Sequence, residues 1–101
     1  MDQDKGEIIM ELKETVELMN SDNYKARFVA EYWQTKIRYE KLKHFNNIIE
    51  ASYITDGEKT CVVEPEHDCP LSLLREQQKA MGDYLHILEL RALIEDIKLE
   101  E

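Results

Sequence analysis

Apolar positions near the start of the chain recur at the three-and-four residue spacing of one helical face. The residues on this face are Ile8, Ile9, Leu12, Val16 and Met19. Because side chains three or four positions apart lie above one another on an α-helix, the pattern predicts a helix over about residues 5–19. The polar segment at 20–23 interrupts the pattern, and Ser21 or Asp22 can cap the helix that follows.

A second stretch, residues 23–52, contains no glycine or proline and is apolar on two sides. At about 100° per residue, one side holds Phe28, Tyr32, Tyr39, Leu42 and Ile49, and the other holds Ala30, Trp33, Ile37 and Ile48. A helix with two apolar sides is usually buried by two neighbours, either both from its own chain or one from a partner subunit. The stretch therefore predicts a long central helix.

A third helix is predicted over about residues 70–98, with Pro70 in its first turn, where the missing N–H costs nothing. Its apolar residues cover more than one face: Leu73, Leu74, Met81, Tyr84, Leu85, Ile87, Leu88, Leu90, Leu93, Ile94 and Ile97. We expect a single all-α domain over residues 1–101, a three-helix bundle or helical hairpin. Because one small domain can bury only a modest core, we also expect a homo-oligomer, most simply a dimer.

The segment at 53–69 between the second and third helices is expected to be a surface loop. Asp56-Gly57 lies between β-branched residues, which is a signal for a short β-hairpin at 53–63. A two-stranded hairpin this short is only marginally stable without a packing surface, so an ordinary loop is the favoured interpretation.

The charge of the chain excludes several classes of partner. The formal net charge is -9, which opposes nonspecific binding to nucleic acid or anionic membranes. No apolar run approaches the roughly 20 residues of a membrane span, and the first residues do not resemble a signal peptide. We expect a cytosolic protein, with Cys61 and Cys69 as reduced thiols.

The middle of this acidic chain is basic. Residues 23–50 carry six Lys or Arg and three Asp or Glu, a net charge of +3, whereas the segments on either side are acidic. This pattern fits either electrostatic pairing between neighbouring helices or a site for a small anionic nucleotide. The candidate ligand residues are Arg27, Arg38 and Lys41 for phosphates, Tyr32 or Tyr84 for base stacking, and Gln34 or Gln77 for base edges.

No motif in the sequence predicts catalysis. There is no glycine-rich phosphate loop and no Ser-His-Asp arrangement, so the chain is expected to be a binding protein without a cofactor, and not an enzyme. His67 and Cys69 are a weak alternative as zinc ligands, because the paired Cys-x2-Cys spacing of common zinc sites is missing. Cys69 is better explained as a small apolar residue at the start of the third helix.

Two long segments, MNSDNYKARFVAEYWQTKIRYEKL at 19–42 and HDCPLSLLREQQKAMGDYLHILELRALIE at 67–95, carry a family resemblance. Together they resemble a family of small all-helical phage and prophage proteins of Gram-positive bacteria and crAss-like phages. The resemblance implies a non-enzymatic phage accessory protein that acts against host physiology or defence. Two functions are then open: an oligomer that sequesters a cyclic-nucleotide signal, or an acidic inhibitor or adaptor that binds a host protein. A structural phage protein is a further alternative.

Overall fold

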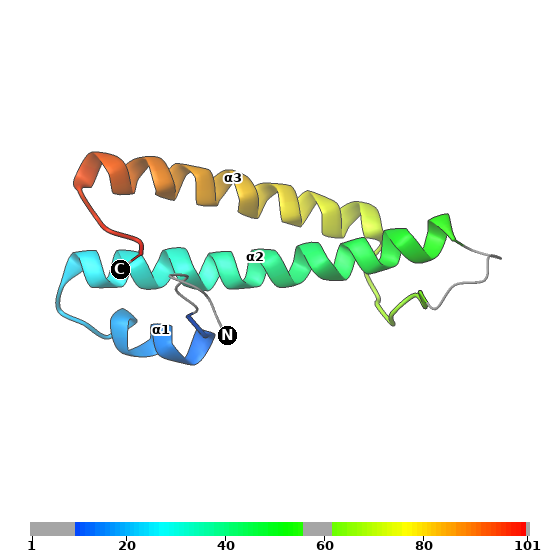
Figure 1. Ribbon diagram of the computed structural model, residues 1–101, viewed down its shortest axis with the longest axis horizontal. Coiled ribbons are helices and arrows are strands. Elements are labelled where there is room, and N and C mark those ends of the chain that lie inside the picture. Colours follow the sequence, from blue (N-terminus) through cyan, green and yellow to red (C-terminus); the bar gives the residue numbers. More distant parts are fainter. Residues whose placement is uncertain (1–9, 56–61, 101) are drawn as a thin grey trace, which may run out of the picture.

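The computed structural model describes residues 10–55 and 62–100, which form three helices (Figure 1). The helices are α1 (Leu12–Met19), α2 (Tyr24–Ile54) and α3 (Leu71–Glu95). Helix α1 packs on one side of α2 and α3 packs on the other, and within the described ranges α1 and α3 do not contact each other. The predicted all-α fold and the central position of the second helix are confirmed.

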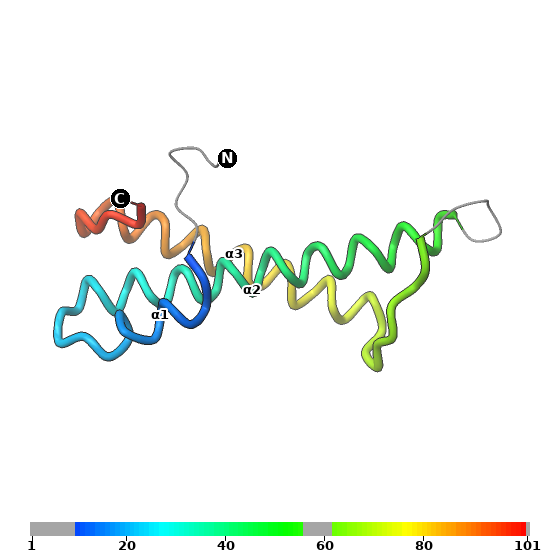
Figure 2. The backbone as a smooth tube through the Cα atoms, turned by 60° about the horizontal axis from the view of Figure 1, so that its bottom comes forward, coloured from blue at the N-terminus to red at the C-terminus, as the bar shows by residue number. Residues whose placement is uncertain are grey.

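Both apolar sides of α2 are buried, as its pattern predicted. Phe28 and Ile49 are buried on one side, and Ala30 and Trp33 on the other. The core contains Phe28, Tyr32 and Trp33 from α2, Leu85, Leu88 and Ala92 from α3, and Ile97 from the C-terminal segment. Because α2 has 31 residues, it is about 46 Å long, and it extends well beyond the short α1 (Figure 2).

The C-terminal segment folds back onto α2 and closes one end of the core (Figure 1). Helix α3 ends earlier than predicted because Asp96 adopts a left-handed conformation, with φ of 58°. This turn buries Ile97 and brings the carbonyl of Leu99 to the indole of Trp33, whose Nε1 donates to it at 2.8 Å. At Trp33, the second apolar side of α2 is therefore covered by a segment predicted to be the end of the third helix.

Helix α1 begins later than predicted and presents a different face to α2. Its first residue is Leu12, and residues 1–9, which include Ile8 and Ile9, lie outside the described ranges. Thr15 is fully buried against α2, whereas Val16 and Met19 are 52% and 41% exposed. A polar contact explains this rotation: Gln34 Nε2 donates to Thr15 Oγ1 at 3.0 Å.

The turn between α1 and α2 is held by polar contacts. Asn23, and not Ser21 or Asp22, caps α2, because its side chain accepts a hydrogen bond from Lys25 N at 2.8 Å. Ser21 supports this cap, since its hydroxyl accepts from Asn23 N at 3.0 Å. The Ser21 carbonyl also accepts a hydrogen bond from Arg27 Nη1 at 2.8 Å.

The hairpin considered for residues 53–63 is not found in the described part of this segment. Tyr53 and Ile54 belong to the last turn of α2, and Val62 and Val63 form no strand. Residues 56–61, with the Asp56-Gly57 signal and Cys61, lie outside the described ranges. None of the three described helices combines the length and the apolar character that crossing a bilayer requires.

The burial pattern predicts how two leucines of α3 contribute to stability. Leu88 is 1% exposed and Leu93 is 81% exposed. We expect Leu88→Ala to lower the free energy of unfolding by about 2–5 kcal/mol, because it leaves a cavity in the core. The exposed control Leu93→Ala should change it by no more than about 0.5 kcal/mol. Urea denaturation followed by circular dichroism measures the free energy of unfolding of both variants, at the same protein concentration as the unmodified chain. Equal losses of stability in the two variants would contradict the α2–α3 packing.

Candidate functional site

The predicted ligand residues on α2 do not converge on one pocket. Arg27 and Gln34 bond to Ser21 and Thr15, so their polar groups hold α1 and its turn against α2. Arg38 and Lys41 are exposed, and neither forms a hydrogen bond or ion pair with any residue in the described ranges. Arg38 and Lys41 are therefore available to a ligand, but they lie on an exposed surface and do not line either of the two pockets described below.

Tyr32 lies apart from these residues, buried in the core between α2 and α3. Its hydroxyl donates to Glu89 Oε2 at 2.9 Å, and burial together with this bond raises the pKa of Tyr32 well above its ordinary value. It lines an acidic pocket of about 390 Å³ with an apolar floor, formed by Tyr32, Glu89, Ala92, Leu93, Ile97, Leu99 and Glu100. Carboxylates at this pocket disfavour a phosphate. The other two candidates, Gln77 and Tyr84, are exposed on α3.

A second pocket, which we call the polar pocket, lies between the middle of α2 and the first half of α3. It has a volume of about 370 Å³ and is lined by Tyr39, Arg75, Gln78, Lys79, Gly82 and Asp83. This volume is at the lower end of the range of small-molecule sites. The polar pocket combines two cations, an aromatic ring and an amide, which are the kinds of side chain predicted for a nucleotide site, together with the carboxylate of Asp83.

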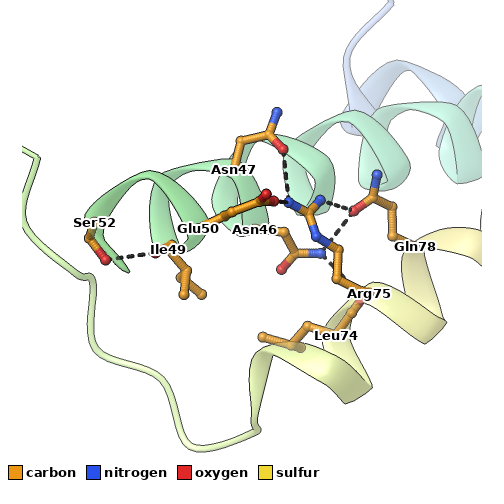
Figure 3. Close-up of polar contacts among 8 residues, drawn as sticks. All are labelled: Asn46, Asn47, Ile49, Glu50, Ser52, Leu74, Arg75 and Gln78. Carbon is orange, nitrogen blue, oxygen red and sulfur yellow. Dashed lines mark hydrogen bonds and ion pairs between the residues drawn. The ribbon is translucent and has the colours of Figure 1, made fainter. Parts of the chain in front are cut away.

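Arg75 forms more polar contacts than Lys79, the other cation of the polar pocket (Figure 3). Its guanidinium donates to Gln78 Oε1 at 2.8 Å and to Asn47 Oδ1 at 3.2 Å, and it forms an ion pair with Glu50. The side chain is about one-third exposed, so the charged end still reaches solvent. The contacts orient the guanidinium at the α2–α3 interface.

Asn46 supports this arrangement from inside the interface. Its side chain is fully buried, and its Nδ2 donates to the Leu74 carbonyl at 3.2 Å and to Gln78 Oε1 at 3.0 Å (Figure 3). Gln78 Oε1 therefore accepts from both Asn46 and Arg75. Because a buried amide costs free energy unless it is hydrogen-bonded, this contact favours one register of α2 against α3.

The aromatic wall of the polar pocket is set by a close approach of the two helices. A Cβ atom at Gly82 would lie 3.2 Å from Tyr39 Cε1, so only glycine lets the ring sit here without a shift. The ammonium of Lys43 lies 5.9 Å from the centre of the same ring. Lys79 also lines the pocket, and its Nζ is 3.0 Å from Asp83 Oδ2.

Sequence reasoning missed the polar pocket, although one signal pointed to it. Arg75 and Lys79 are spaced by four on the predicted third helix, and Gly82 is an isolated glycine inside that helix. A glycine inside a helical pattern costs about 1 kcal/mol relative to alanine, so it indicates a close contact. The pairing with Tyr39 depends on the register of two helices and could not be obtained from the spacing.

The alternative of His67 and Cys69 as metal ligands finds no support in the geometry of His67. Its Nδ1 lies 2.6 Å from the Cys69 carbonyl and its Nε2 lies 2.8 Å from Glu64 Oε2. Each ring nitrogen therefore lies within hydrogen-bonding distance of an oxygen of its own loop, and neither faces an open position for a metal. Cys69 is a free, exposed thiol, and no group of three or more metal-ligating side chains occurs among the described residues.

Comparison with known protein families gives a match. The family model described as Sequestin matches residues 22–94, which include α2, α3 up to Ile94 and every residue that lines the polar pocket. No curated protein and no solved structure matches the chain.

The contacts of His67 predict a titration shift. Hydrogen bonds to Glu64 and to the Cys69 carbonyl raise the pKa of His67 above its ordinary value of 6.5. Their contribution to stability is therefore fully present below pH 6.5 and is lost as the pH rises through the raised pKa. NMR titration should give a midpoint above 6.5, and Glu64→Gln should move it back towards 6.5. Glu66→Gln, an exposed carboxylate of the same loop, should leave it in place; equal shifts in both variants would contradict the specific pairing.

Proposed function

The chain belongs to the Sequestin family, and from this premise we propose that it sequesters a small anionic nucleotide signal as a homo-oligomer, without catalysis, in the polar pocket. Sequestin is a phage-associated anti-defence family, and its name denotes sequestration. A protein that acts by sequestration needs a site that binds and holds its ligand, and does not need catalytic groups. The observation that carries the proposal is the convergence of Arg75 and Lys79 beside Tyr39.

The cations of the polar pocket suit a phosphate even though each has a carboxylate partner. Arg75 is paired with Glu50 and Lys79 with Asp83, and three of these four side chains are at least half exposed. Ion pairs exposed to solvent contribute only about 0–1 kcal/mol, so exchange of a carboxylate for a phosphate costs little. A phosphate gains a bidentate, charge-assisted contact with the guanidinium.

The other residues that line the polar pocket supply groups that can bind the base of a nucleotide. Tyr39 offers a ring for stacking, and stacking of a base on an aromatic side chain contributes about 1–3 kcal/mol. Gln78 has its Oε1 occupied by Arg75 and Asn46, which leaves its amide nitrogen as a donor to a base edge. In this proposal the residues expected from the sequence, Arg38 and Lys41, lie elsewhere on the circumference of α2 and attract the ligand without lining the pocket.

The second candidate function is an acidic inhibitor or adaptor of a host protein. The observation that favours it is the acidic pocket, where Glu89 and Glu100 border an apolar floor. A lysine or arginine side chain of a partner has an apolar stem and a charged end, which fits such a pocket. Binding of this kind would weaken steeply as salt rises, because exposed charges are screened over about 10 Å at 0.1 M ionic strength.

Arg75→Ala tests the polar pocket. We expect this change to weaken nucleotide binding by roughly 10- to 100-fold, because hydrogen bonds to a charged group contribute about 1.5–3 kcal/mol. Isothermal titration calorimetry measures the affinity, after native mass spectrometry has identified the ligand in a panel of cyclic di- and trinucleotides. Arg38→Ala is the matched control, since it removes an exposed arginine of α2, and it should weaken binding much less.

A further variant separates ligand binding from a structural role of Arg75. Glu50→Gln removes the carboxylate that competes with a phosphate, so affinity should rise; a purely structural arginine would give no rise. Circular dichroism checks that each variant keeps its helices. Full affinity in Arg75→Ala with loss in Arg38→Ala would move the site to the surface of α2. No binding of any nucleotide would remove this proposal and favour the host-protein inhibitor.

A further inference from the structure

The side of α3 that points away from α2 carries an exposed apolar surface. We define this outer stripe as Leu73, Ala80, Tyr84, Ile87, Leu90 and Ile94. The exposed fractions of its large residues range from 40% for Tyr84 to 83% for Ile94. Because Leu85, Leu88 and Ala92 already bury the opposite side of α3, the outer stripe is additional to the core.

The outer stripe has the spacing of a helix that packs against another helix. Leu73, Ala80, Ile87 and Ile94 are each separated by seven residues. A seven-residue apolar repeat keeps these four side chains on one side of the helix along its whole length. The second position of a coiled-coil repeat is apolar only at Leu90, because Glu76 and Asp83 occupy it in the first two turns of the repeat. No described residue of this chain covers this side of α3, since α1 packs on α2 and not on α3.

We propose that the outer stripe is the surface on which a second copy of this chain docks, with the two α3 helices antiparallel. A two-fold axis between Asp83 and Tyr84 makes the repeat of Leu73, Ala80, Ile87 and Ile94 complementary to itself, with Tyr84 opposite Asp83 and Leu90 opposite Gln77. It places Ala80 opposite Ile87 of the second copy, a small residue against a large one. The same axis places Leu73 opposite Ile94, so the repeat is in contact at both ends.

Charge complementarity favours this antiparallel arrangement over a parallel one. Glu76 and Arg91 flank the stripe and are both exposed, and the same two-fold axis brings Glu76 of each copy to Arg91 of the other. A parallel pair would bring like charges together instead. Within its own chain Arg91 donates from Nε to Glu95 at 3.0 Å and from Nη2 to the Tyr24 hydroxyl at 2.6 Å, so the ion pair with Glu76 of the second copy adds to these contacts or replaces them.

This dimer specifies the homo-oligomer on which the proposed function relies, but it does not depend on the nucleotide. The cations of the polar pocket lie outside the outer stripe, where Arg75, Lys79 and Gly82 are spaced by four and three; Asp83 is the lining residue next to the two-fold axis. Loss of the dimer and loss of ligand binding can therefore be measured separately. A dimer with no nucleotide affinity would leave this inference standing while the proposed function fails.

Sedimentation velocity on the full chain tests the surface. The unmodified chain should sediment with twice the mass of one chain, and Ile87→Asp should raise the dimer dissociation constant by at least about tenfold. Leu93→Asp is the matched control, because Leu93 is 81% exposed on the same helix but outside the stripe; it should remain dimeric. Ile87 is itself about half exposed, so circular dichroism should show unchanged helices. A monomer at all concentrations, or a dimer unaffected by Ile87→Asp, would overturn the inference.

Cross-linking tests the direction of the two helices. Chains in which Cys61 and Cys69 are replaced by serine receive a single cysteine, Ala80→Cys in one preparation and Ile87→Cys in another. A short bismaleimide should link the mixture far more efficiently than either preparation alone, because position 80 faces position 87 across the axis. Efficient linking within each single preparation, with no gain on mixing, would show parallel helices and overturn the register.

Discussion

The burial of α2 on two sides is the constraint on which the rest of this structure depends. Among residues 10–55 and 62–100, α2 contacts both other helices and these do not contact each other, so α1 and α3 are connected through α2. Phe28 and Tyr32 contact α3, while Trp33 fixes the returning C-terminal segment through Leu99. A change that rotates or shortens α2 would therefore affect both halves of the core at once.

Polar contacts inside this apolar framework decide how α2 and α3 align. Hydrophobic contacts are not directional and would tolerate several positions of one helix along the other. The Asn46 Nδ2 finds both of its acceptors only where the Leu74 carbonyl and Gln78 are within reach, and Arg75 meets Glu50 at the same position. This alignment also brings Tyr39 to Gly82, and the polar pocket is a result of it. Stability and the candidate site thus share the same contacts.

The proposed function and the proposed dimer use different parts of α3. Arg75, Gln78 and Gly82 line the polar pocket on the side of α3 towards α2, whereas the outer stripe is exposed on another side. The two surfaces meet at Asp83, which lines the pocket and lies next to the proposed two-fold axis. Membership in the Sequestin family agrees with a binding role, and the match covers both helices on which these surfaces lie.

The sequence by itself determined the number and type of the helices, the central place of α2 and its two buried sides, because these follow from the helical period of apolar residues. It also contained the isolated Gly82 and the seven-residue repeat of α3. Tertiary structure alone decided that Thr15 and not Val16 faces α2, that the segment after Asp96 turns back, and that Arg75 meets Tyr39 in one pocket. Each of these depends on a contact between residues distant in sequence, and periodicity within one helix carries no information about which residue of another helix lies opposite.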